Sequence, residues 1–112
     1  MGGKTIIIYS PSVRAYLIEL IAMLYKKEYF GFEDSAHQYV ERIRQNIRKD
    51  LPQQTNHRTT PTELKHFGEN YISIKLNNQT TWYVIFDQKD NRFFVGLITN
   101  SYSPQSAFFN LD

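Results

Sequence analysis

Two nearly continuous apolar segments in the C-terminal half limit what this chain can fold into. They span residues 82–86 and 93–98, and the polar turn Lys89-Asp90-Asn91 lies between them. Short apolar runs rich in aromatic and β-branched residues are typical of central strands that are covered on both faces. The short polar turn predicts that the two strands form an antiparallel hairpin.

A third strand is predicted just before this hairpin, because apolar and polar residues alternate along residues 71–76. Alternation places successive side chains on opposite faces of a sheet. One face carries Ile72, Ile74 and Leu76, and the other carries Tyr71, Ser73 and Lys75. The polar segment Asn77-Asn78-Gln79 is expected to turn the chain into the hairpin.

A first strand is predicted near the N-terminus, over the β-branched segment Thr5-Ile6-Ile7-Ile8-Tyr9. It must leave the sheet through the helices that follow and then return. It therefore either lies at an edge or pairs in parallel with the last strand, and the sequence leaves both arrangements open.

A helix is predicted to begin at Pro11, with Ser10 as its N-terminal cap, because proline lacks the N–H that would be unpaired there. Apolar residues then recur at the spacing of one buried helical face. They are Val13, Tyr16, Leu17, Leu20, Ile21, Leu24 and Tyr25. Gly31 breaks this pattern.

A second helix is predicted with Asp34 or Ser35 as its cap, since Gln38 follows Ser35 at the spacing of a capping box. Pro52 is expected to end it. Its apolar stripe consists of Ala36, Tyr39, Val40, Ile43, Ile47 and Leu51, and its opposite face carries Arg42, Arg44, Arg48 and Lys49. That basic face is either a solvated helix surface or a contact for phosphates or an acidic partner.

The predicted order is strand, helix, helix, strand, strand, strand, over a single domain of residues 1–112. The expected fold is α+β, with a two-helix hairpin packed on a largely antiparallel sheet. Between the helices and the later strands, residues 52–61 are predicted to be an exposed loop, and residues 63–67 a helical turn. The polar tail contains the apolar pair Phe108-Phe109, which is expected to dock onto the body.

Composition narrows the classes of function. The chain has no cysteine, so disulfides, thiol nucleophiles and cysteine-based zinc sites are excluded. His37, His57 and His66 are too widely spaced for a helical metal site, and no glycine pattern typical of nucleotide binding occurs. We therefore expect no metal, no cofactor and no membrane association, and we expect a cytoplasmic protein. The net charge of +2 is compatible with contact to nucleic acid or to an acidic partner.

RNA cleavage is the chemistry that such a chain could still perform. The 2′-hydroxyl of RNA is an internal nucleophile, so a protein need only orient it, supply an acid or base, and stabilise phosphate charge. Polar residues on the open side of the predicted sheet are the candidates, namely Lys75, Asn100, Ser101 and Tyr102. Each could equally be a solvated residue on an exposed face or rim.

Several strings, in this order and spacing, resemble the RelE/ParE superfamily of toxins from type II toxin–antitoxin systems, which includes plasmid stabilisation proteins. They are Tyr9-Ser10-Pro11, Val40-Glu41-Arg42-Ile43, Tyr71-Ile72-Ser73-Ile74-Lys75, Tyr83-Val84-Ile85-Phe86-Asp87 and Ile98-Thr99-Asn100-Ser101-Tyr102. The resemblance implies a toxin neutralised by an antitoxin that wraps over its helices and sheet. The RelE branch cleaves mRNA in the ribosome, and the ParE branch inhibits DNA gyrase.

The residues that carry catalysis in the RelE branch are mostly replaced here. That branch has basic residues on the strand after the helices, an arginine opening the next strand, and an arginine and a tyrosine after the last strand. Lys75 matches one strand lysine, but Ser73 stands at its partner position. The other three positions fall on Thr81 or Trp82, on Tyr102 and on Phe108.

The resemblance therefore implies a toxin that binds a macromolecular target in the ParE manner, with DNA gyrase as the candidate target. The alternatives are a RelE-like, metal-independent mRNA endonuclease and a non-toxic protein-interaction domain. A rearranged catalytic set would use Lys75 and Tyr102 with His57, Arg58 and His66. Target contacts are expected at Arg58, His66, Asn100 and Ser101, and antitoxin contacts at Leu17, Ile21, Tyr39 and Ile43.

Overall fold

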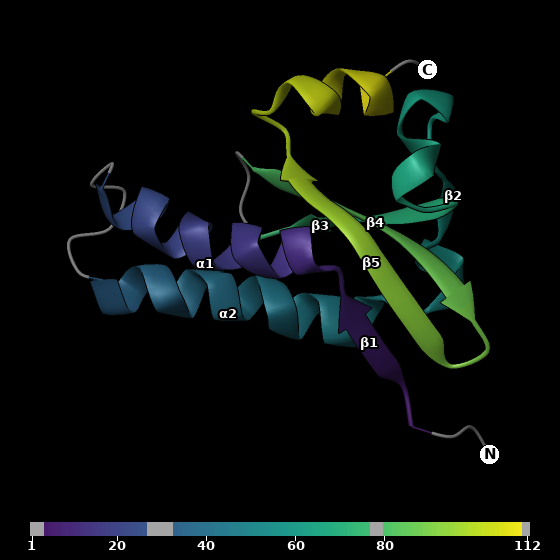
Figure 1. Cartoon of the computed structure of the whole chain (residues 1–112), viewed down its shortest axis with the longest axis horizontal. Coiled ribbons are helices and arrows are strands. Elements are labelled where there is room, and N and C mark those ends of the chain that lie inside the picture. Colours follow the sequence, from purple (N-terminus) through teal and green to yellow (C-terminus); the bar gives the residue numbers. More distant parts are fainter. Residues whose placement is uncertain (1–3, 27–32, 77–79, 111–112) are drawn as a thin grey trace.

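A computed structural model of the chain describes residues 4–26, 33–76 and 80–110, which form an α+β fold with two helices on a five-stranded sheet (Figure 1). In chain order the main elements are β1 (Ile6–Tyr9), α1 (Pro11–Lys26), α2 (Glu33–Asp50), β2 (Arg58–Thr59), β3 (Asn70–Lys75), β4 (Thr81–Lys89) and β5 (Arg92–Asn100). Three 3₁₀ helices accompany them: η1 (Gln54–Asn56), η2 (Thr62–Phe67) and η3 (Pro104–Asn110). The α+β class and the order of the predicted helices and strands are confirmed.

The strands lie in the order β1-β5-β4-β3-β2. Strand β1 pairs in parallel with β5, and all other neighbours are antiparallel. Both arrangements that the sequence left open for β1 therefore hold, because it lies at the edge and runs parallel to the last strand. The two-residue strand β2 lies in the segment predicted to be a loop, where it extends the opposite edge through Arg58 and Thr59.

The start of α1 confirms the predicted cap. The Ser10 side-chain oxygen accepts a hydrogen bond from the Val13 N–H at 3.1 Å, and the Ser10 carbonyl accepts one from the Arg14 N–H at 3.0 Å. The cap predicted for the second helix is wrong, because α2 begins at Glu33 and places Asp34 and Ser35 inside its first turn. Gly31 and the segment 77–79 lie outside the described residues.

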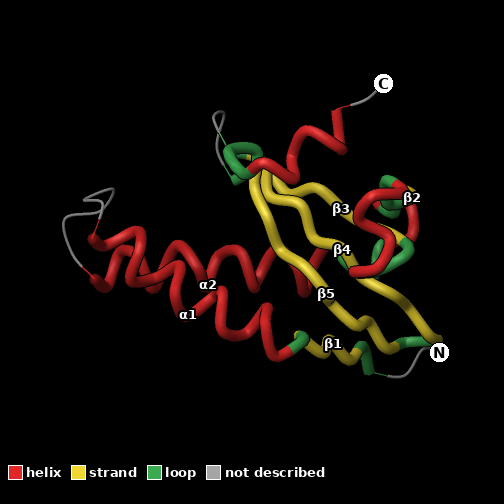
Figure 2. Tube along the Cα trace, turned by 45° about the horizontal axis from the view of Figure 1, so that its top comes forward, coloured by secondary structure: helices red, strands yellow, loops and turns green. Residues whose placement is uncertain are grey.

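The main core lies between the two helices and the sheet. Helices α1 and α2 cover one face of β3, β4 and β5 (Figures 1 and 2). The buried members of this core are Val13, Leu17, Leu20, Val40, Ile43, Ile47, Leu51, Ile72, Ile74, Trp82, Val84, Phe86, Phe93, Val95 and Ile98. Burial raises the pKa of the Tyr9 and Tyr16 phenols at the margin of this core, since it disfavours their charged forms.

A second, smaller core lies on the other face of the same strands. Leu64 of η2 and Phe109 of η3 are buried there against Tyr83 and Ile85 of β4, with Leu97 of β5 partly buried beside them. Figure 2 shows that η2 and η3 lie on the opposite side of the sheet from α1 and α2. Residues 82–86 are consequently all buried, as predicted for a strand that is covered on both faces.

Gly96 allows η2 to lie close to the sheet. The pairing of β4 with β5 shifts register between Ile85 and Phe86, which leaves Gly96 unpaired in a bulge of β5. A Cβ atom at Gly96 would lie 2.0 Å from the carbonyl oxygen of Phe67, the last residue of η2. A backbone atom cannot move aside as a side chain can, so only glycine fits this close approach.

We expect Gly96→Ala to destabilise the fold by about 3 kcal/mol, because it forces η2 away from β5. Urea unfolding followed by circular dichroism measures this free energy. Ser73→Ala, at an exposed position of β3, is the matched control and should change stability by less than about 0.5 kcal/mol. Equal stability of the two variants would contradict the close contact at Gly96.

Candidate functional site

Two of the predicted site residues lie at one end of the open sheet face, which is the face away from α1 and α2. Lys75 of β3 is opposite Thr81 of β4. Thr81 in turn exchanges hydrogen bonds with Ser101, whose N–H donates to the Thr81 carbonyl at 2.9 Å and whose hydroxyl accepts from the Thr81 N–H at 3.2 Å. Lys75 and Ser101 are thus two strand spacings apart, or roughly 10 Å.

The residues after β5 form a tight polar turn. The side-chain oxygen of Asn100 accepts a hydrogen bond from the Tyr102 N–H at 2.9 Å, and the Asn100 carbonyl accepts one from the Ser103 N–H at 3.0 Å. The side chains of Asn100 and Ser101 therefore hold the end of β5 in place. The Tyr102 ring lies at the surface and is 71% exposed.

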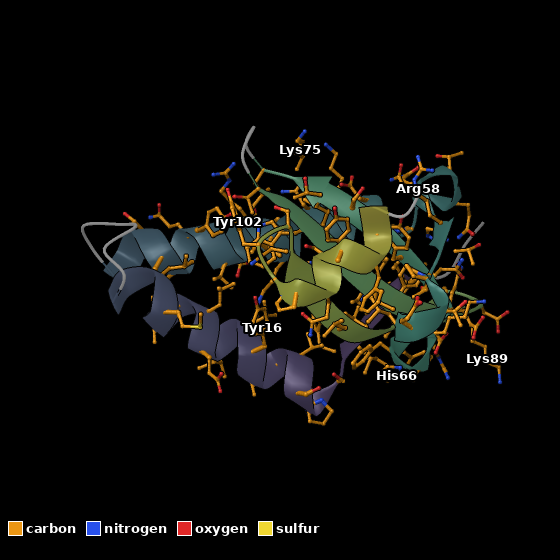
Figure 3. All side chains as sticks on the ribbon, turned by 90° about the horizontal axis from the view of Figure 1, so that it is seen from above. Tyr16, Arg58, His66, Lys75, Lys89 and Tyr102 are labelled. Atoms are coloured by element: carbon orange, nitrogen blue, oxygen red, sulfur yellow. The ribbon has the colours of Figure 1, made fainter. Side chains whose placement is uncertain are left out.

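The remaining predicted target contacts lie elsewhere. Figure 3 shows Arg58, His66, Lys75 and Tyr102 spread over the molecule, with no two of them adjoining. His66 is exposed, and the centroid of its ring lies 4.0 Å from the centroid of the Phe67 ring. A site that requires all four side chains at one substrate is not formed.

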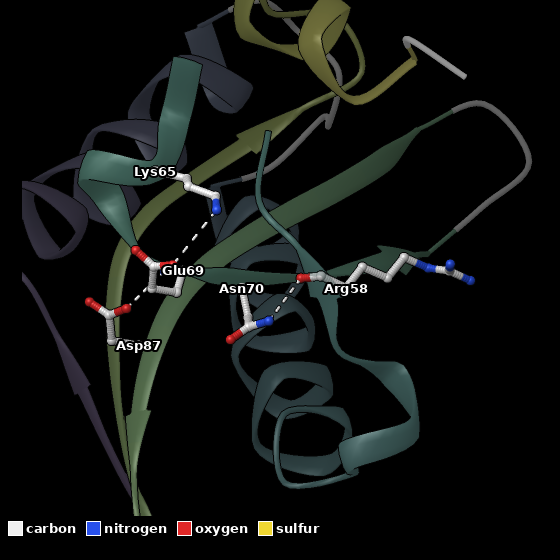
Figure 4. A network of polar contacts seen from close by, with 5 residues as sticks. All are labelled: Arg58, Lys65, Glu69, Asn70 and Asp87. Atoms are coloured by element: carbon white, nitrogen blue, oxygen red, sulfur yellow. Dashed lines mark hydrogen bonds and ion pairs between the residues drawn. The ribbon is translucent and has the colours of Figure 1, made fainter. Parts of the chain in front are cut away.

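Arg58 lies beside a small polar network at the β2 edge (Figure 4). Its carbonyl accepts a hydrogen bond from the Asn70 side chain at 3.3 Å, while its guanidinium points away from the network. Next to it, Lys65 and Glu69 form an exposed ion pair at 3.8 Å, and the Glu69 N–H donates to an Asp87 carboxylate oxygen at 2.8 Å. These contacts connect β2 to β3 and the segment between η2 and β3 to β4, while the Arg58 side chain remains exposed.

His57 has a structural position that the sequence did not reveal. It lies in the segment that was expected to be an exposed loop, but its Nε2 lies 2.7 Å from the Leu51 carbonyl oxygen, and its ring meets Phe86 edge to face with centroids 4.7 Å apart. It closes the margin of the main core near the end of α2. This placement removes His57 from the rearranged catalytic set.

Aromatic rings occupy the middle of the open face. Phe109 stacks on Tyr83, with ring centroids 4.1 Å apart and planes at 4°. Tyr71 meets Phe109 edge to face, with centroids 4.7 Å apart. The expected docking of the apolar pair is therefore confirmed for Phe109, which is buried, whereas Phe108 is partly buried.

A pocket of about 380 Å³ opens beside these rings, between η2, β3 and η3. Tyr71, Phe108 and Phe109 line one part of it, and Thr59, Pro61, Thr62 and Glu63 line the rest. The nearby hydroxyl of Thr60 is buried and makes no hydrogen bond within the described residues. Sequence reasoning missed this pocket, because no periodic pattern shows where a tail will dock.

Two of the four residues expected to contact an antitoxin are inaccessible. Leu17 and Ile43 are fully buried between the helices and the sheet. Ile21 and Tyr39 are partly buried at the margin, where the Tyr39 hydroxyl accepts a hydrogen bond from the Trp82 indole at 2.9 Å. Of these four residues, only Ile21 and Tyr39 have surface that a partner could touch without opening the core. A contact surface on the helices would therefore include these two residues but not Leu17 or Ile43.

Among the described residues, no three potential metal ligands gather at one place. No helix within the same residues is long and apolar enough to cross a membrane. No protein-family model matches the chain, and no curated protein matches it.

Phe109→Ala should destabilise the protein by about 3 kcal/mol, because it removes the ring that covers Tyr83 and Tyr71. The unfolding free energy from chemical denaturation measures this loss. Tyr102→Ala serves as the control, since that exposed ring should contribute less than about 0.5 kcal/mol. A Phe109 variant as stable as the Tyr102 variant would mean that η3 is not part of the fold.

Proposed function

We propose that this chain is a RelE/ParE-like toxin that acts by binding a macromolecular target and is neutralised by a cognate antitoxin. By its resemblance to the ParE branch, DNA gyrase is the first candidate for that target. The main support for binding rather than catalysis is the packing of the open sheet face. Phe109 stacks on Tyr83 in the middle of that face, where a nuclease would need accessible polar groups.

The distribution of polar side chains also favours a binding surface. Arg58, Lys75 and Tyr102 are exposed, and they lie around the rim of the open face rather than at its centre. Catalysis needs groups held together at one reacting centre. Recognition of a protein needs only side chains spread over a surface, and arginine and tyrosine are both enriched in such contacts.

A RelE-like mRNA endonuclease is the second candidate, and one observation favours it. Lys75 and Ser101 share one end of the open face, and the exposed Tyr102 follows directly. A lysine can stabilise phosphate charge, and a tyrosine can act as an acid or base toward the 2′-hydroxyl. A smaller site at this rim would thus use only part of the expected set.

Induced expression in a bacterial host tests both candidates. We expect growth to stop with cellular mRNA intact and with a DNA-damage reporter switched on. Lys75→Ala and Tyr102→Phe should remain toxic, as should the control Lys89→Ala at the far end of β4, next to the β4–β5 turn.

Other outcomes would assign the function differently. New cleavage sites in translated mRNA that disappear in Lys75→Ala or Tyr102→Phe, but persist in Lys89→Ala, would replace binding with RNA cleavage. Unimpaired growth with soluble, folded protein would contradict a toxin of either kind.

A further inference from the structure

The outer face of α1 is apolar although it lies on the surface. Between residues 11 and 24 the helix carries only two charged side chains, Arg14 and Glu19. Ile18 is 66% exposed and Met23 is 45% exposed, and Ala15 and Ala22 are exposed beside them. A helix that is apolar on both its inner and outer faces is ordinarily covered on both.

The neighbouring helix shows the contrast. Over residues 35–50 of α2, every exposed position carries a polar or charged side chain; these positions are His37, Gln38, Glu41, Arg42, Gln45, Arg48 and Lys49. Both helices pack on the same core through their inner faces. The outer face of α1 therefore differs from an ordinary solvated helix surface within this same protein.

Three of the exposed apolar residues of α1 form a narrow line along the helix, and Met23 lies to one side of it. Ala15, Ile18 and Ala22 are three and four residues apart, which is the spacing of the a, d and a positions of a two-helix seam. The small alanines on either side of Ile18 allow another helix to approach closely. The inward-facing residues of this helix, such as Leu17 and Leu20, are buried in the core and are not part of this line.

The two charges select the partner. Arg14 and Glu19 lie on opposite flanks of this line, at the g and e positions, and within the described residues neither makes an ion pair. In a parallel helix pair, a g residue faces the e residue five positions later in the other helix, which joins residue 14 to residue 19. In an antiparallel pair a g flank faces a g flank and an e flank faces an e flank, so Arg14 would not meet Glu19. A second copy of the chain in parallel orientation therefore satisfies both charges.

We propose that α1 forms a parallel, two-fold symmetric interface between two copies of this chain. Ile18 packs against its symmetry mate between the alanines, and Arg14 of each copy pairs with Glu19 of the other. With 16 residues the helix is about 24 Å long, so the interface is small and the affinity should be micromolar. This inference does not depend on the proposed function.

Sedimentation equilibrium of the full chain, from about 1 to 300 µM, tests the interface. We expect the mass to rise from 13.3 kDa toward twice that value with increasing concentration. Ile18→Asp should abolish the rise, and because Ile18 is exposed this variant should keep its fold by circular dichroism.

Charge reversal tests the orientation of the two helices. Arg14→Glu and Glu19→Arg should each weaken association about tenfold, because each replaces two attractive contacts with repulsive ones. The double variant should restore the wild-type affinity, and Arg42→Glu on the exposed face of α2 is the matched control.

Three results would overturn the proposal. The first is a wild-type protein that stays monomeric at every concentration. If Ile18→Asp then impairs binding of another protein, the face binds that protein and not a second copy of the chain. The second is a dimer that survives Ile18→Asp. The third is a double variant that stays as weak as the single ones, which would exclude the parallel pairing of Arg14 with Glu19.

Discussion

The structure depends on the need to cover both faces of β4 and β5. Five consecutive residues of β4, from Trp82 to Phe86, are buried, so neither face of the sheet centre can be left to water. Helices α1 and α2 cover one face, and η2 and η3 cover the other. The C-terminal segment is consequently part of the folded body, and its docking decides which positions of the open face remain for function.

Much of this arrangement could be predicted from the sequence, because it follows from local patterns. The spacing of apolar residues predicted both helices, the alternation at Ile72 and Ile74 predicted β3, and Ser10-Pro11 predicted the start of α1. Contacts between distant segments could not be predicted in this way. The approach of Phe67 to Gly96 and the insertion of His57 against Phe86 depend on three-dimensional packing that has no periodic signal.

In the candidate site, too, features that follow from local sequence patterns could be predicted and contacts between distant segments could not. Lys75 at the end of β3 and Ser101 just after β5 lie on either side of Thr81 of β4, so both are at one end of the sheet, as their order along the chain implies. The pocket beside Tyr71 and Phe109 was missed, since a tail of only seven helical residues can dock at many places. The apolar stripe of α1 likewise predicted its buried face but not the exposed line through Ile18, which became evident only once burial was known.

Nuclear Overhauser contacts between the ring protons of Tyr83 and Phe109 test the central claim most directly. Strong contacts are expected, because the two ring centroids are 4.1 Å apart. Their absence, together with random-coil chemical shifts for residues 104–110, would show that the open face of the sheet is bare. In that case the choice of a binding surface over a catalytic one would lose its structural support.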